Sequence, residues 1–129
     1  MLITGVDIIE IERIDRVATK YGDRFLEKIY TQSERDYCRG RGPQLASRFA
    51  AKEAVMKALG TGIRGIGWKD IEIKRKRGGA PFIELHGRAL ERSDQIGLHE
   101  LALSLTHSQD FAVASVVGQS EKGNLIPRN

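Results

Sequence analysis

The sequence predicts an α+β fold with a mostly antiparallel sheet and helices packed on one face. Segments rich in β-branched residues lie at both ends of the chain, and a long stretch with helical periodicity lies between them. Two pairs of short strand-like segments are each joined by a turn, which makes each pair an antiparallel hairpin. Because 129 residues correspond to roughly one domain, we expect a single domain at 1–118 and a C-terminal tail at 119–129.

The first part of the chain is expected to form a strand and then a helix. Leu2–Ile9 is rich in β-branched residues, which favour a strand. From Ile11 to Phe25 the apolar residues recur at helical spacing. Gly22 and Asp23 are expected either to break this helix, with Asp23 capping its second part, or to leave its phase unchanged.

Two further helices are expected before the chain turns to strands. The segment Thr31–Glu34 fits a capping box, which would begin a short helix that ends at Cys38. Pro43 suits the first turn of a helix, and an alanine-rich sequence continues that helix to Leu59. Four glycines between positions 60 and 67 then predict a loop.

The second half is expected to contain a hairpin, a helix and a second hairpin. Turn residues at 78–81 and at 107–110 separate the paired segments. The predicted order of strand, three helices, hairpin, helix and hairpin is an α+β pattern. The expected elements of this half are strands at 70–75 and 82–86, a helix at 87–96, and strands at 101–106 and 111–117.

The composition excludes several classes of protein. Cys38 is the only cysteine, so neither an intramolecular disulfide nor a Cys-based zinc site can form. No apolar run approaches the ~18–20 residues of a membrane span, and the first residues lack the pattern of a signal peptide. We therefore expect a cytoplasmic protein that makes no membrane contact. The net charge of +4 and the pI of 9.4 favour an acidic partner but also suit an ordinary soluble surface.

Two acidic residues are candidates for chemistry. Asp7 stands near the end of the first strand, where a carboxylate can hold a hard cation, although a helix cap or a solvated charge would also explain it. Glu53 shares a helix face with Phe49 and Lys57 at a spacing of four residues, as ordinary surface Glu–Lys pairs do. The surrounding helix is alanine-rich and expected to be buried, so Glu53 would need a partner, a metal or a raised pKa.

A phosphate-binding segment is possible after this helix. Gly60-Thr61-Gly62 offers backbone N–H groups and a hydroxyl beside Lys57. It is not a P-loop, because the lysine precedes the glycines. The dipole at a helix C-terminus disfavours anions, so phosphate binding would depend on side chains and metal. His107, at a strand end, would either bind phosphate or close the turn.

Basic residues form a stripe on the predicted first helix, beside its apolar face. The stripe is either a solvated face or a surface for an acidic partner, provided that Gly22 does not change the helical phase. Its members are Arg13, Arg16, Lys20 and Arg24. A small basic nucleic-acid-binding module is the alternative function, and Lys74–Arg77 would support it. That alternative explains neither Asp7 nor Glu53, and few aromatic residues are available to stack bases.

Three segments together resemble the bacterial holo-[acyl-carrier-protein] synthases, which are small 4′-phosphopantetheinyl transferases. They are Gly5–Ile11, Phe49–Ala54 followed by Lys57, and Ser104–Ser108, and the similarity covers about residues 1–118. The resemblance implies Mg²⁺-dependent transfer of 4′-phosphopantetheine from coenzyme A to a serine of apo acyl carrier protein, for fatty acid biosynthesis, with release of adenosine 3′,5′-bisphosphate. It also implies the fold of that family and a homotrimer with active sites between subunits.

The resemblance assigns roles to individual residues. Asp7 and Glu53 would be the Mg²⁺ ligands, and Lys57 would be a further catalytic residue that places a cation at the pyrophosphate. Ile9 stands where larger relatives carry another acidic residue, so a water would take that place. The base for the serine would be Glu53, Asp7 or a water held by the metal and a carboxylate. The basic stripe would bind the acidic carrier protein, and the residues that bind coenzyme A would be Arg48, Lys57, Gly60, Thr61, Gly62, Pro81, Thr106 and His107.

Overall fold

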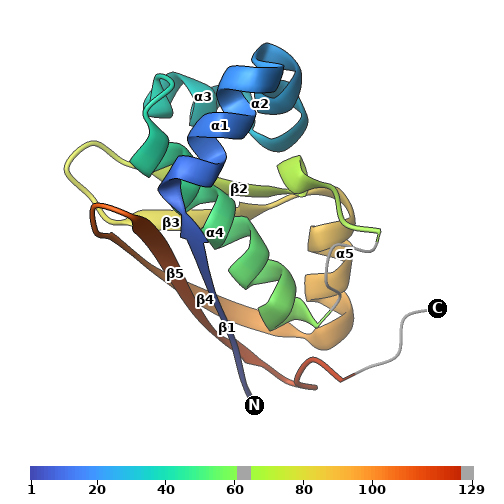
Figure 1. The fold of residues 1–129 in the computed structure, drawn as a ribbon. Helices are drawn as coiled ribbons and strands as arrows, with labels where there is room; N and C mark the ends of the chain where they lie inside the picture. Colours follow the sequence, from blue (N-terminus) through green and yellow to red (C-terminus); the bar gives the residue numbers. More distant parts are fainter. Residues whose placement is uncertain (61–64, 126–129) are drawn as a thin grey trace.

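The strands are arranged in two antiparallel sheets. The structure, a computed structural model, describes residues 1–60 and 65–125. Within them one sheet has the order β1–β5–β4, and the other pairs β2 with β3 (Figure 1). The strands are β1 (Leu2–Glu10), β2 (Ile71–Arg75), β3 (Pro81–Leu85), β4 (Leu98–His107) and β5 (Phe111–Ser120). The predicted α+β class and antiparallel pairing are confirmed, with two sheets in place of one.

Helices cover one face of the three-stranded sheet. The longest helix, α4, lies across this face and packs on β1 and β5 (Figure 1). Within the described ranges, no helix is both long and apolar enough to cross a membrane. The helices are α1 (Ile11–Tyr21), α2 (Asp23–Ile29), α3 (Gln32–Cys38), α4 (Gly42–Leu59) and α5 (Gly87–Ile96), and a 3₁₀ turn, η1, covers Trp68–Asp70.

Gly22 separates α1 from α2. Its backbone has φ +59° and ψ −138°, outside the helical region and accessible chiefly to glycine. Asp23 is the first residue of α2 and makes no capping hydrogen bond, so the prediction that it caps this helix is wrong. The chain changes direction at Gly22, and the helical phase of α1 therefore does not continue into α2.

The other local signals act as expected. The Thr31 side chain accepts a hydrogen bond from the Glu34 N–H, and the Glu34 carboxylate accepts one from the Thr31 N–H, which completes the capping box of α3. Pro43 lies in the first turn of α4, and Gly60 ends that helix with φ +78°. The capping box gives partners to backbone N–H groups at the start of α3, and Pro43 has no N–H group that would need one. The N–H of Gly60 donates to carbonyl groups in the last turn of α4.

The contact between β1 and α4 is unusually close and positions the first strand. A Cβ placed on Gly5 would collide with the carbonyl oxygen of Ala54, so only glycine fits there. Ala50, Ala54 and Ala58 are completely buried, and their small side chains allow this approach. Asp7 lies two residues after Gly5 on the same face of the strand, so it is directed toward α4.

The last two strands are longer than predicted. β4 begins at Leu98, directly after the left-handed Gly97, and β5 continues to Ser120. Residues 119 and 120, predicted to be part of the tail, are therefore strand. The Ser120 hydroxyl donates to the carbonyl oxygen of Ile96, and the amino group of Met1 donates to the carbonyl oxygen of Ser120. These bonds hold the end of β5 against α5 and β1.

Candidate active site

Asp7 and Glu53 line one pocket, although they are far apart in the sequence. β1 supplies Asp7 and α4 supplies Glu53, and the close approach at Gly5 brings these elements together. The pocket has a volume of about 460 Å³ and is otherwise walled mainly by apolar side chains of β1, α1, α2 and α4. Arg13 of α1 also lines it. The predicted meeting of the two carboxylates is thus present in the fold.

Asp7 is paired with Lys57 across the β1–α4 contact. The Lys57 Nζ lies 3.1 Å from Oδ1 of Asp7 and donates to the carbonyl oxygen of Val6 at 3.0 Å. The Asp7 side chain is 15% exposed, so it is not a freely solvated charge. Nor does it cap a helix, because the residue before α1 is Glu10 and makes no side-chain cap. Both ordinary explanations of Asp7 are therefore excluded.

Glu53 is a carboxylate whose negative charge is only partly compensated. Within the described part of the chain, no hydrogen bond or ion pair reaches its oxygens, because Lys57 is directed to Asp7. Partial burial and the negative charge of Asp7 raise the pKa of Glu53, and the positive charges of Lys57 and Arg13 only partly offset this. The surface Glu–Lys pair considered from the sequence is not formed.

The Asp7–Glu53 pair fits a hard divalent cation. Mg²⁺ is usually bound by one or two carboxylates with water and substrate phosphate completing its octahedral shell. A cation between the two oxygens would lower the raised pKa of Glu53 and remove its repulsion with Asp7. The donor set is therefore suitable for Mg²⁺.

A second pocket contains the other residues predicted to bind coenzyme A. Arg48, Pro81, Thr106 and His107 line a cavity of about 520 Å³ between α4, β3 and the end of β4. Its lining is distinct from that of the Asp7–Glu53 pocket. Arg48 and Glu53 are five residues apart on α4, so their side chains leave the helix about 140° apart. Within one chain, the predicted Mg²⁺ ligands and these four predicted coenzyme A-binding residues therefore lie in two separate pockets.

Tyr37 and Arg75 also line the second pocket and were not predicted. The guanidinium of Arg48, which is only 5% exposed, lies 4.4 Å from the centre of the Tyr37 ring. Arg75 Nη1 lies 3.5 Å from the Tyr37 hydroxyl. Nothing in the local sequence marks these residues, because α3 and β2 meet here only after folding.

The glycine-rich candidates are only partly described. Gly60 is the residue after α4, three positions beyond Lys57, and it lies against Asn124 and Arg92 rather than in the lining of either pocket. Thr61 and Gly62 lie outside the described residues.

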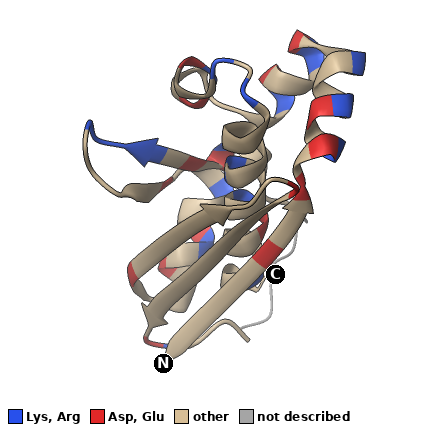
Figure 2. Cartoon of the chain, turned by 60° about the vertical axis from the view of Figure 1, so that its left-hand side comes forward, with Lys and Arg blue, Asp and Glu red and all other residues tan. Residues whose placement is uncertain are grey.

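The basic stripe is shorter than predicted. Arg13, Arg16 and Lys20 are exposed on α1, but Arg24 lies on α2, beyond the change of direction at Gly22. Figure 2 shows that acidic residues also lie on these helices. The expectation of one helical stripe through Arg24 is therefore wrong, while three of its members remain on one helix.

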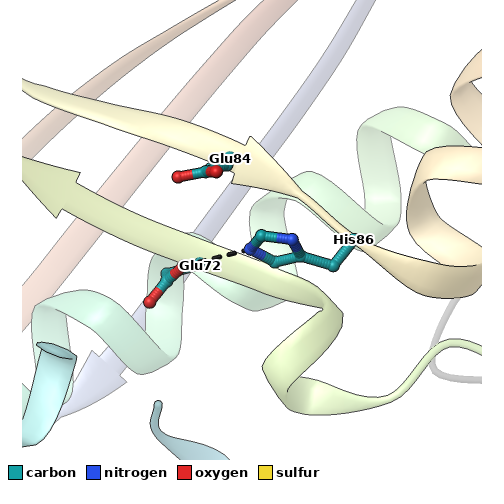
Figure 3. A group of neighbouring side chains, drawn as sticks. All are labelled: Glu72, Glu84 and His86. Carbon is teal, nitrogen blue, oxygen red and sulfur yellow. Dashed lines mark hydrogen bonds and ion pairs between the residues drawn. The ribbon is translucent and has the colours of Figure 1, made fainter. Parts of the chain in front are cut away.

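A second acidic group lies on the small sheet, at Glu72, Glu84 and His86 (Figure 3). Glu72 and Glu84 face each other directly across β2 and β3. The hydroxyls of Thr31 and Ser33 donate to Glu72 Oε2 at 2.6 and 2.7 Å, and His86 Nε2 lies 3.0 Å from Oε1. These bonds outweigh the effect of burial and lower the pKa of Glu72 to about 2. Because the protein itself satisfies Glu72, we interpret this group as structural.

Comparison with known proteins agrees with the geometry. The family model of the 4′-phosphopantetheinyl transferase superfamily matches residues 3–116. The chain belongs to this superfamily. It is 44% identical to the holo-[acyl-carrier-protein] synthase of Herpetosiphon aurantiacus over 125 residues, which cover 92% of this chain and 98% of the relative. It is 46% identical to that of Moorella thermoacetica over 123 residues, covering 93% and 95%.

Solved structures of the same enzymes share the fold. The holo-[acyl-carrier-protein] synthase of Helicobacter pylori, in complex with coenzyme A, has a TM-score of 0.82 and 34% identity, covering 90% of this chain and 99% of that one. The enzyme from Neisseria meningitidis has a TM-score of 0.81 and 35% identity, covering 92% and 98%. The resemblance identified from three motifs is confirmed, and the chain is a phosphopantetheinyl transferase rather than a nucleic-acid-binding module.

Proposed function

We propose that this enzyme transfers 4′-phosphopantetheine from coenzyme A to a serine of an apo acyl carrier protein, with Mg²⁺, and releases adenosine 3′,5′-bisphosphate. The observation that carries this proposal is that Asp7, which is paired with Lys57, and Glu53, whose pKa is raised, line one pocket. The relatives named holo-[acyl-carrier-protein] synthase, and the complex of one of them with coenzyme A, support the choice of substrates.

Asp7, Glu53 and Lys57 would act together on the pyrophosphate of coenzyme A. Asp7 and Glu53 would hold Mg²⁺, which when bound polarises the pyrophosphate and offsets the charge of the leaving group. Lys57 would place its ammonium group beside the same phosphates, since its Nζ already lies at Asp7. Phosphoryl transfer requires mainly this kind of positioning and electrostatic stabilisation, which these three charged side chains would supply.

The nucleotide end of coenzyme A would occupy the second pocket. Arg48 and His107 supply groups for phosphate, and Pro81 and Tyr37 supply apolar and aromatic surface. Because one chain directs Arg48 and Glu53 to different sides of α4, we propose that the complete site forms between two subunits of a homotrimer.

The uncovered face of the three-stranded sheet supports this assembly. Several of the exposed side chains that alternate with the buried ones are apolar, including Val6 and Ile8 of β1 and Val117 of β5. Figure 2 shows that these long strands carry almost no charged residues. An exposed apolar surface of this kind is typical of an interface between subunits.

Co-expression of two inactive variants tests the shared site. Glu53→Gln changes a residue of the Asp7–Glu53 pocket, and His107→Ala changes a residue of the second pocket. If neighbouring subunits complete each site, mixed oligomers regain a substantial part of the activity, because some sites then contain both wild-type residues. Activity no greater than the sum of the two variants would contradict a shared site. Light scattering gives the mass of the oligomer in the same samples.

The exposed basic residues of α1 would bind the acidic carrier protein. Arg16 and Lys20 are better tests of this role than Arg13, because Arg13 also lines the Asp7–Glu53 pocket. Arg16→Glu is expected to raise the KM for carrier protein and leave that for coenzyme A nearly unchanged. The effect should weaken with salt, since exposed charges are screened over about 8 Å at physiological ionic strength. Equal increases in both KM values would contradict docking on α1.

Intact-mass spectrometry of an apo acyl carrier protein tests the proposed reaction. We expect a gain of one phosphopantetheine after incubation with the enzyme, coenzyme A and Mg²⁺. The gain should disappear without Mg²⁺ and with Glu53→Gln, and persist with Glu84→Gln as the matched carboxylate control. No gain with any of several carrier proteins would reject the proposed function.

A further inference from the structure

The C-terminal end of α4 is capped by side chains from distant parts of the chain. The last carbonyl groups of a helix have no partners within the helix and carry partial negative charge. Here the carbonyl oxygen of Leu59 accepts from Arg92 Nε at 2.9 Å, and that of Ala58 accepts from Asn124 Nδ2 at 2.9 Å. Two carbonyl groups that directly precede Gly60 are thus satisfied by α5 and by the segment after β5.

Arg92 and Asn124 are also joined to each other. Arg92 Nη2 donates to the carbonyl oxygen of Asn124 at 2.9 Å, and Arg92 is only 3% exposed. A buried guanidinium needs acceptors, and the negative end of α4 provides one of them. The carbonyl oxygen of Asn124 comes so close to Gly60 that a Cβ at that position would collide with it.

The segment that carries Asn124 is itself anchored. The N–H of Glu121 donates to the carbonyl oxygen of Gly97 at 3.0 Å, and that of Lys122 donates to Ile96 at 3.1 Å. The hydroxyl of Ser120 donates to the carbonyl oxygen of Gly123 at 3.0 Å. The matched family model ends at residue 116, before this segment begins.

The contacts at the C-terminal end of α4 change the charge near Lys57 and Gly60, the two proposed phosphate-binding residues there. Lys57 occupies the last turn of α4 and Gly60 follows it, yet a helix C-terminus is unfavourable for an anion. The buried guanidinium of Arg92, bonded to the terminal carbonyl group of Leu59, offsets that charge, and the bond from Asn124 to Ala58 helps to hold the last turn. We propose that Arg92 and Asn124 are positioning residues, which hold Lys57 and Gly60 for the phosphates of coenzyme A. This inference rests on the proposed function.

Asn124→Ala is the first variant to measure, because it removes one hydrogen bond to α4 without removing a charge. We expect the KM for coenzyme A to rise roughly three- to tenfold, as for the loss of one hydrogen bond, with kcat and the KM for carrier protein nearly unchanged. The same change should appear in the calorimetric Kd for coenzyme A. Leu125→Ala is the matched control, because Leu125 is 88% exposed and adjacent in sequence.

Arg92→Lys provides a second test in a variant that keeps the charge. It is expected to retain more affinity for coenzyme A than Arg92→Met, which keeps an unbranched side chain but removes the charge. If Asn124→Ala and Arg92→Lys lower the melting temperature without changing the affinity for coenzyme A, the two residues only stabilise the fold and the inference is wrong. Equal increases in both KM values would also overturn it. Failure of the wild-type enzyme to modify any carrier protein would instead reject the proposed function.

Discussion

Two acidic groups in this molecule have opposite electrostatic environments. In the group on the small sheet, Glu72 accepts from two hydroxyls and lies against His86, and its pKa is lowered to about 2. In the pocket between β1 and α4, Glu53 has no such donor and its pKa is raised by burial and by Asp7. Both groups bring carboxylates together, but only the second leaves negative charge for a ligand to neutralise.

The difference shows that proximity of carboxylates does not identify a cation site. Glu72 and Glu84 face each other across a hairpin, where like charges are unfavourable, but Lys74 lies 2.9 Å from Glu84 and removes that cost. Lys57 forms an ion pair with Asp7 and only partly offsets the raised pKa of Glu53. The hydrogen-bond donors around each oxygen therefore distinguish the structural group from the functional one.

The largest expected effect is on catalysis. Glu53→Gln keeps the size of the side chain but removes a proposed ligand, so kcat/KM should fall by more than about 100-fold, the upper range for loss of a group that merely supports a ligand. Glu84→Gln in the structural group should change kcat/KM by less than about threefold. Steady-state kinetics with saturating Mg²⁺ measure both values. A loss of similar size in the two variants would remove the functional distinction between the groups.

A smaller effect is expected on stability. Glu72→Gln weakens the bonds from Thr31 and Ser33, so the free energy of unfolding should fall by about 1.5–3 kcal/mol at pH 7, the range for hydrogen bonds to a charged group. The activity of the folded protein should be retained. Urea denaturation measures the first quantity, and a variant as stable as wild type would show that the hydroxyls do not depend on the carboxylate.

The pH dependence of the same variant follows from linkage. The pKa of Glu72 is about 2 in the fold and 4.5 in the unfolded chain. Its contribution to stability is therefore complete above pH 4.5 and is lost as the pH falls toward 2. Wild type should lose stability over this interval more steeply than Glu72→Gln, in urea titrations between pH 5 and pH 2. Parallel curves would contradict the lowered pKa.

Local sequence predicted most of the elements, because their causes are local. The capping box at Thr31, the helix start at Pro43 and the helix end at Gly60 each depend on a few neighbouring residues. Asp23 failed as a cap because Gly22 takes that position, and the same glycine moves Arg24 to another helix.

Within the site, motif resemblance predicted what local pattern could not. Asp7 and Glu53 meet only through the contact of Gly5 with α4, and periodicity does not reveal that contact. Tyr37, Arg75, Arg92 and Asn124 were missed because each acts on an element distant in sequence.

The smallest expected effect is a slight increase in the free energy of unfolding when Glu53 is replaced, whereas replacing Glu72 is expected to lower it. A carboxyl group whose pKa is raised in the fold destabilises it above its unfolded pKa, and this cost disappears as the pH falls below that value. Glu53→Gln should therefore be slightly more stable than wild type at pH 7 without Mg²⁺, and equal to it near pH 4. Adding Mg²⁺ should reverse the order, because bound cation stabilises only the protein that retains both carboxylates. Thermal unfolding with and without Mg²⁺ measures this reversal, and a Glu53→Gln variant stabilised by Mg²⁺ as much as wild type would place the cation elsewhere.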